Sequence, residues 1–77
     1  MGAGDKAVDR HEHDVLRTLV REWRTRAGLS QRELSARLSR PHNFIVKVEG
    51  GTRGLQIVEA LDIARACGQD PLRFFQE

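Results

Sequence analysis

Residues 39–51, with the sequence SRPHNFIVKVEGG, begin with side chains whose chemistry suits the edges of DNA bases. Asn43 can form two hydrogen bonds with adenine, Lys47 can donate to O6 or N7 of guanine, and Phe44 can touch a thymine methyl group. His42 adds a titratable group beside Asn43. Because Lys47 follows Asn43 by four residues, a helix would bring both side chains to one face. This spacing predicts a surface able to contact base edges.

Positive charge is concentrated in the central half of the chain. Residues 14–53 contain nine Arg or Lys and four Asp or Glu, a local charge of +5, whereas residues 1–13 sum to −1 and residues 54–77 to −2. This asymmetry favours a polyanionic partner over a small acidic molecule, the alternative being an ordinary solvated helical surface. The side chains expected to bind backbone phosphates or to position the protein on them are Gln31, Arg32, Arg40, Thr52 and Arg53.

Apolar periodicity predicts the helices that must position these side chains. A first helix starts near Asp14 and stops at Gly28, because glycine readily adopts the left-handed conformation that ends a helix. A capping box, SQRE, starts a second helix at Gln31. Pro41 suits the first turn of a third helix over residues 41–50. The residues expected to face the core from these helices are Leu16, Leu19, Val20, Trp23, Leu34, Leu38, Ile45 and Val48.

Two further helices complete the predicted domain. A fourth helix covers residues 56–66, and a short fifth helix starts at Asp70 and Pro71. The inward-facing residues expected in the fourth helix are Ile57, Val58, Leu61 and Ala64, and the apolar residues of the fifth are Leu72, Phe74 and Phe75. Strand signals are weak, because the chain has no Tyr and no Asn-Gly or Asp-Gly turn. We therefore expect one all-α domain of five helices over residues 14–77, preceded by a flexible tail over residues 1–13.

The second and third predicted helices are joined by about three residues, which is the dimension of a helix-turn-helix. The stretch LSQRELSARLSRPHNFIVKVEGG resembles the Cro- and phage-repressor-type helix-turn-helix family, also called the XRE family. The residues that fall in register with the family pattern are Leu29, Ser30, Gln31, Glu33, Leu34, Leu38, Ile45, Lys47, Val48, Glu49 and Gly51. The resemblance implies a compact five-helix, lambda-repressor-like DNA-binding domain, with residues 41–50 as the helix in the major groove.

The resemblance also implies roles for individual residues. The family positions that carry DNA contacts match Gln31, His42, Asn43, Phe44 and Lys47. A further implied feature is a structural ion pair between Arg24 and Glu49, which would hold the third helix against the first. These roles add to the chemistry of the residue types and define the site that the sequence predicts.

The chain departs from the family pattern at a few positions. Ser39 and Arg40 stand in the turn, where the family usually has glycine and a small aliphatic residue. Val46 takes a position that is commonly small and polar, and Gly50 one that is often basic. These departures leave the fold intact, but they prevent the transfer of any sequence preference to this chain.

Three of the residues expected to contact bases also have a purely structural interpretation. For Asn43 the alternative is a plain amide on a helix surface, and for His42 it is a solvated side chain in the first turn. For Phe44, packing on Leu38 and contact with DNA are equally consistent with its position. The sequence leaves these alternatives open.

The function predicted from the charge pattern and the resemblance is that of a sequence-specific, repressor-like transcriptional regulator. It would bind double-stranded DNA as a homodimer on a near-palindromic operator. The residues expected at the dimer surface are Leu72, Phe74 and Phe75, and the alternative for one of the two phenylalanines is closure of the monomer core. The rival function is a protein-interaction module, such as an antitoxin-like or adaptor protein with the same fold.

Several function classes are not supported by the sequence. We expect no enzyme, because no paired carboxylates, no nucleophile with a histidine partner and no phosphate-binding glycine loop are evident. A single cysteine, Cys67, and the His11–His13 pair in a polar segment predict neither a metal site nor a cofactor. No long apolar run or signal-peptide pattern is present, so we expect a cytoplasmic protein with no membrane contact and no small-molecule effector.

Overall fold

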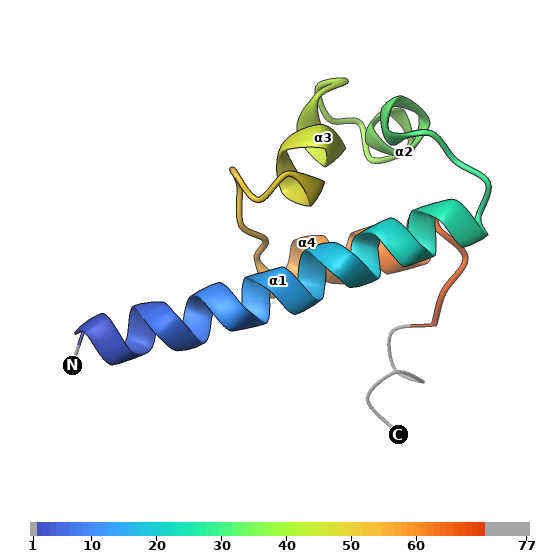
Figure 1. The fold of residues 1–77 in the computed structure, drawn as a ribbon. Helices are drawn as coiled ribbons and strands as arrows, with labels where there is room; N and C mark the ends of the chain where they lie inside the picture. The colour runs from blue at the N-terminus through green and yellow to red at the C-terminus, as the bar shows by residue number, and fades with distance from the viewer. Residues whose placement is uncertain (1, 71–77) are drawn as a thin grey trace.

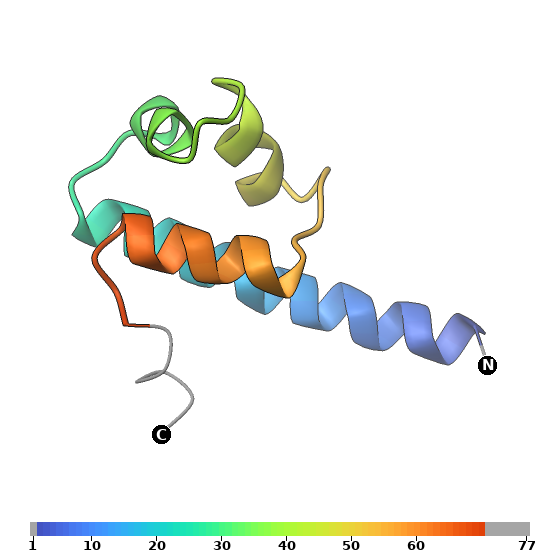
Figure 2. The same cartoon turned by 180° about the vertical axis from the view of Figure 1, so that it is seen from behind.

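The computed structural model describes the backbone of residues 2–70 and, within them, the side chains of residues 14–70. This part of the chain consists of α1 (Gly2–Arg26), α2 (Gln31–Arg37), α3 (Phe44–Glu49) and α4 (Ile57–Ala66). In Figure 1 and Figure 2, α4 runs beside the C-terminal half of α1, while α2 and α3 lie together over this pair. The all-α class is therefore confirmed. No described helix is both long and apolar enough to span a membrane.

The predicted start of the first helix near Asp14 is wrong, because α1 already begins at Gly2. The sequence pattern placed the start where the apolar stripe begins, but a helix also forms from residues of high helix propensity without such a stripe. The strong helix formers in this segment are Ala3, Lys6, Ala7, Arg10 and Glu12. The separation of a flexible tail from a domain at residue 14 stays a prediction, and the fifth helix expected after Asp70 lies outside the described residues.

Each of the four described helices ends in the same backbone arrangement. The residue after the C-cap has a positive φ, its amide donates to the carbonyl three residues back, and the next amide donates to the carbonyl five residues back. This is the Schellman motif, which satisfies carbonyls that a helix end leaves free. The residues with positive φ are Gly28, Ser39, Gly51 and Gly68. Ser39 is the exception among them, since its side chain makes the left-handed conformation costly.

The core lies where the four helices meet. Its buried side chains are Val20, Leu34, Phe44, Ile45, Val48, Ile63 and Cys67, and the partly buried residues packed against them are Trp23, Leu29, Leu38, Leu55 and Ala66. The inward positions predicted for the second and third helices are thus buried or partly buried. Cys67 is buried as expected for a core thiol, and its burial raises the pKa of the thiol.

The buried face of α4 agrees with the prediction at Ala64, which is fully buried, but differs from it in the first turn of the helix. Ile57 and Val58 were expected to face inward, but they are 78% and 65% exposed. The buried stripe instead repeats every four residues from Glu59 through Ile63 to Cys67. Because this stripe begins with a carboxylate, apolar periodicity in the sequence does not reveal it. Glu59 can be buried because its charge is paired, as described below, and the helix is rotated accordingly.

Candidate nucleic-acid interface

The helix-turn-helix is formed by α2, the turn of residues 38–43, and α3. The third helix was predicted to start at Pro41, but α3 starts at Phe44, with Asn43 as its N-cap residue. The amide of Phe44 donates to the carbonyl of Pro41 at 2.9 Å, so residues 41–44 form a tight turn before the helix. His42 and Asn43 are therefore presented by this turn, and α3 itself is one turn shorter than predicted.

A buried serine of α2 caps α3. The hydroxyl of Ser35 accepts a hydrogen bond from the amide of Ile45, the second residue of α3, at 3.1 Å. The side chain of Asn43 makes no capping hydrogen bond with its own helix. The amide that an N-cap residue would normally satisfy is thus satisfied from the preceding helix. This contact joins α2 to α3, gives the reason why α3 begins at Phe44, and was not foreseen from the sequence.

The ion pair implied for Arg24 and Glu49 is present, and it also includes Gln31. The guanidinium Nε and Nη2 of Arg24 donate to the two oxygens of Glu49 at 2.6 and 3.0 Å. Nη1 of Arg24 donates to the carbonyl of Leu29 at 3.0 Å, and the Gln31 amide donates to Glu49 at 3.1 Å. Both charged side chains are largely buried, and the hydrogen bond to Glu49 raises the pKa of Arg24. This network ties α1, the start of α2 and the end of α3 into one unit.

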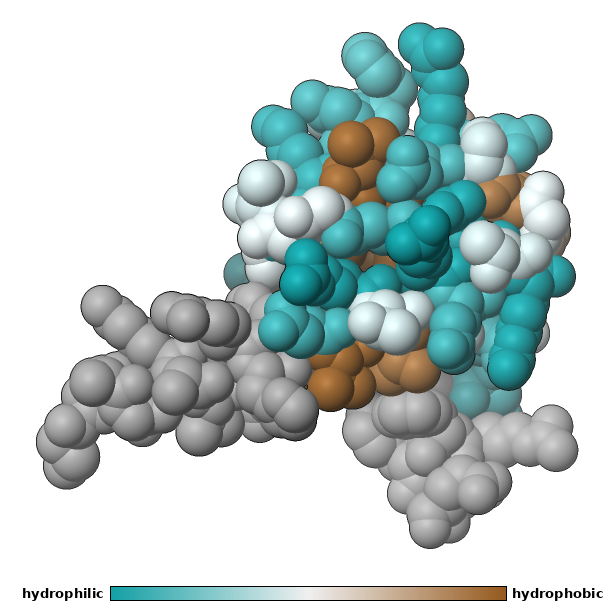
Figure 3. Space-filling view, viewed as in Figure 1, coloured by the Kyte–Doolittle hydropathy of each residue, from teal (hydrophilic) through white to brown (hydrophobic). Residues whose placement is uncertain are grey.

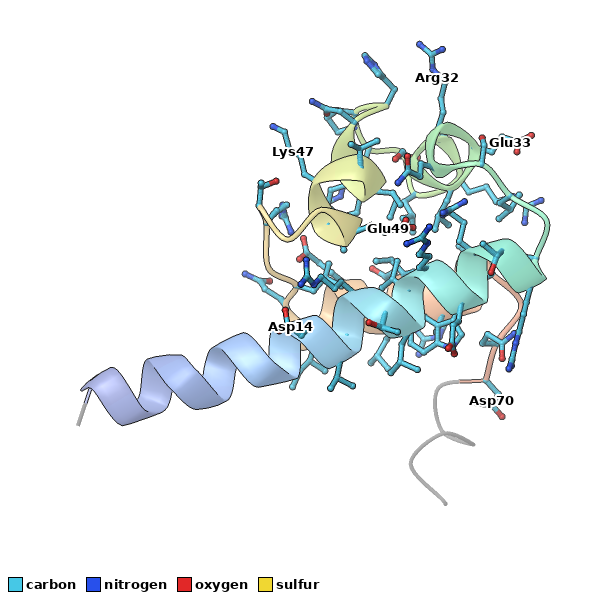
Figure 4. The ribbon with its side chains drawn as sticks, in the orientation of Figure 1. Asp14, Arg32, Glu33, Lys47, Glu49 and Asp70 are labelled. Atoms are coloured by element: carbon cyan, nitrogen blue, oxygen red, sulfur yellow. The ribbon has the colours of Figure 1, made fainter. Side chains whose placement is uncertain are left out.

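The outer face of α3 and its preceding turn carry polar side chains. His42, Asn43 and Lys47 are exposed, and among the described residues their side chains make no hydrogen bond or ion pair. In Figure 4, Lys47 points away from the body of the protein, whereas Glu49 points toward α1. Arg32 of α2 also points outward in Figure 4 and has no ion-pair partner among the described side chains. These side chains are therefore free to bind another molecule.

Phe44 does not belong to this exposed face. Its ring is only 5% exposed and packs in the core, so the predicted contact with a thymine methyl group is corrected in favour of the packing alternative. The exposed apolar residue of α3 is Val46, at 47%. It lines a solvent-open groove of about 610 Å³ between α1, α2 and α3, together with Arg21 and Gln31. Figure 3 shows a mostly hydrophilic surface here, with a small apolar area over α3.

Arg40 and Arg53, which the sequence predicts as phosphate ligands, are both joined to a buried carboxylate of α4. Nη2 of Arg40 donates to Glu59 at 2.9 Å, and Arg53 donates to both Glu59 oxygens, each at 2.9 Å. The Cζ atoms of the two arginines lie 4.7 and 4.9 Å from the centroid of the Phe44 ring. The hydrogen bonds from Arg53 and from the backbone amide of Gln56, together with the charges of the two arginines, lower the pKa of Glu59 to about 2. We call Phe44, Arg40, Arg53 and Glu59 the Glu59 cluster.

The remaining predicted site residues are placed as follows. Thr52 is exposed, and its hydroxyl donates to the carbonyl of Lys47 at 3.2 Å, which extends the C-terminal cap of α3. Leu72, Phe74 and Phe75 lie outside the described residues, and so do the side chains of His11 and His13. Among the side chains that are described, no group of three or more His, Cys, Asp or Glu is arranged to hold a metal ion.

Four residues of this site are not predicted by the sequence pattern: Arg21, Ser35, Val46 and Glu59. No local signal exists for Ser35, because its partner Ile45 lies ten residues along the chain. Glu59 has a local partner, the Gln56 amide, with which it forms the capping box of α4, but its arginine partners lie before and after α3. In the sequence, Val46 stands out as a departure from the family pattern. Its exposure follows from the helical period, since Ile45 and Val48 occupy the buried side of α3.

The fold and the site together define the class of this protein. Two short helices, α2 and α3, are joined by a tight turn, and α3 is fastened both to α2 and to α1. Its other side presents a polar face. This arrangement is that of a helix-turn-helix domain.

Comparison with known proteins agrees with this class. The family described as "Helix-turn-helix domain" matches residues 15–73. The chain is 38% identical over 55 residues to an uncharacterized HTH-type transcriptional regulator of Methanothermobacter thermautotrophicus, covering 71% of this chain and 80% of that protein. It is also similar to the solved structure of an XRE-family like protein from Pseudomonas syringae pv. tomato, with a TM-score of 0.82 and 36% identity, covering 95% of this chain and 89% of the other. The chain belongs to the XRE-type helix-turn-helix family.

Proposed function

We propose that this protein is a sequence-specific regulator of transcription that binds duplex DNA, with repressor-like action at a near-palindromic operator. The observation that carries the proposal is the contrast between the two sides of α3. Its inner side is held by the Arg24–Glu49 pair and by Ser35, whereas its outer side and preceding turn present His42, Asn43 and Lys47. A rigid helix with an exposed polar face suits insertion into the major groove.

The exposed side chains have the chemistry that direct readout requires. The Nδ2 group of Asn43 can donate to N7 of adenine while its Oδ1 accepts from the N6 amino group, and Lys47 can donate to O6 or N7 of guanine. The methyl groups of Val46 replace the buried Phe44 ring as the apolar group available to a thymine methyl. Arg21 and Arg32, exposed on α1 and α2, can bind phosphates on either side of the groove.

We further propose that the protein acts as a homodimer. Two recognition helices about 34 Å apart would enter successive major grooves on one side of the duplex. The exposed pair Ile57 and Val58 at the start of α4 supports a dimer surface on this helix, because large apolar side chains that are this accessible favour association. In sedimentation experiments, replacing Ile57 with Ser should weaken dimerisation, and an unchanged association constant would exclude α4 from the dimer surface.

Duplex selection and salt dependence test the function. Bound duplexes selected from a random pool should converge on one near-palindromic sequence. The logarithm of the binding constant should fall linearly with the logarithm of salt concentration, by about 0.9 per phosphate contacted. A salt-independent response, or no binding to duplex DNA at about 50 mM salt, would contradict the proposal and favour the rival protein-interaction module.

A further inference from the structure

The Glu59 cluster brings together side chains from three separate parts of the chain. Arg40 comes from the turn before α3, Arg53 from the loop after it, and Glu59 from the first turn of α4. Both guanidinium groups nevertheless lie over the ring of Phe44, the first residue of α3. The cluster is therefore located at the N-terminal end of α3, next to the turn that presents His42 and Asn43.

We propose that Glu59 is a positioning residue that holds Arg40 and Arg53 together as a preformed clamp for one phosphate group of the DNA backbone. This inference rests on the proposed function of duplex binding. By its negative charge alone, Glu59 would weaken DNA binding. In this role it strengthens DNA binding instead.

The arginines keep donors for such a phosphate. A guanidinium group has five N–H donors, of which Arg40 uses one, to Glu59, and Arg53 uses three, two to Glu59 and one to the Gly54 carbonyl. Arg40 thus keeps four free N–H groups and Arg53 two. The side chains of Arg40 and Arg53 are 40% and 37% exposed, so both are partly accessible to a ligand from solvent, whereas Glu59 itself is buried.

The charges of the cluster leave it attractive to a phosphate. Two guanidinium groups and one carboxylate have a net charge of +1, and the carboxylate is ionised at neutral pH. Free arginine side chains lose conformational entropy when a ligand immobilises them. Here the ring contact and the ion pairs with Glu59 have already restricted both side chains. The clamp would therefore bind a phosphate with a smaller entropic loss than two free arginines.

The decisive experiment compares Glu59→Gln with Asp62→Asn in binding of the whole protein to a random-sequence duplex over a range of salt concentrations. Both changes remove one negative charge from α4, but Asp62 pairs with Arg65 and makes no ion pair with Arg40 or Arg53. Electrostatics alone predicts equal or tighter binding for both variants. We expect E59Q to bind about three- to tenfold more weakly and its salt slope to fall by about 0.9, as for one lost phosphate contact, while D62N binds as well as the wild type or better.

A second variant separates positioning from folding. Arg40→Lys keeps the charge of a side chain at the surface but loses the planar group that stacks on Phe44 while bonding to Glu59. We expect about two- to fivefold weaker binding for R40K, with circular dichroism showing wild-type helix content. If E59Q does not fold, the affinity of R40K relative to wild type tests the clamp: weaker binding supports it and unchanged binding overturns it.

The possible failures are distinguishable. If the wild type binds duplex DNA with the expected salt dependence but E59Q and R40K bind as tightly as wild type with the same slope, Glu59 has a purely structural role and the inference is overturned. If the wild type itself shows no salt-dependent binding, the proposed function fails, and the inference fails with it.

Discussion

The hydroxyl of Ser35 in α2 accepts a hydrogen bond from the amide of Ile45 in α3 at 3.1 Å, with both residues fully buried. One helix of the motif thus supplies the cap of the other. The contact determines where α3 begins and contributes to its orientation relative to α2. It also leaves the side chain of Asn43, the N-cap residue by position, without a capping role and available to a ligand.

Replacing Ser35 with Ala should destabilise the domain, because it leaves a buried amide without an acceptor. We expect the free energy of unfolding to fall by about 1–3 kcal/mol, measured by chemical denaturation. Thr18→Ala is the matched control, since the Thr18 hydroxyl is exposed and bonds to the Asp14 carbonyl of its own helix. The control should change stability by less than about 0.5 kcal/mol. Equal effects of the two variants would show that the Ser35 cap adds no stability.

Ser39 is the position where a substitution should stabilise the protein. Its φ is 56°, whereas the matching residue at the end of each other described helix is glycine. Ser39→Gly removes the contact between the side chain and its own backbone in this conformation, and we expect a gain of about 0.5–1 kcal/mol after the entropy cost of glycine. Ser39→Ala keeps the Cβ atom and should give no gain. Thermal unfolding of the three proteins checks this, and a stabilised S39A would refute the explanation.

Asn43 and Arg32 should affect DNA binding in different ways. Asn43→Ala should reduce the preference for the selected operator over random duplex by about 1–3 kcal/mol, because a base edge loses its hydrogen-bonding partner. Arg32→Ala should weaken binding to both duplexes about equally and lower the salt slope by about 0.9, as expected for a phosphate contact. Competition titrations with both duplexes distinguish these outcomes. If N43A weakened both complexes equally, Asn43 would not contact a base.

Glu59 should make the stability of the domain depend on pH in the acid range. The folded-state pKa is about 2, below the ordinary value of 4.5, so the folded state releases this proton more readily than the unfolded state. The stabilisation is therefore fully present above about pH 4.5 and is lost as the pH falls toward 2. We expect a loss of about 1–2 kcal/mol, because the partly exposed arginines are screened by solvent. The difference in unfolding free energy between wild type and E59Q should shrink across this range, and a constant difference would contradict the assignment.

Much of the helical framework is encoded in short stretches of the chain. The capping box of Ser30 and Glu33 starts α2 where the sequence predicts it, and Gly28, Gly51 and Gly68 follow the ends of their helices. The buried stripe of Leu34, Ile45 and Val48 follows from periodicity alone. These features depend on neighbours within about one helical turn, so they can be read without knowledge of the tertiary structure. The Arg24–Glu49 pair is predicted by the family resemblance.

The composition of the site depends on contacts between residues that are distant in the chain. The hydrogen bond from Ile45 to Ser35 determines that α3 starts after Asn43. The arginines on either side of α3 allow Glu59 to be buried. Because Glu59 faces inward, Ile57 faces solvent. The ring of Phe44 lies in the core with both guanidinium groups over it. Periodicity shows that a helix has an apolar side, but a buried carboxylate is stable only beside its partners. Folding brings those partners together. It also determines which side chains stay exposed and available to bind DNA.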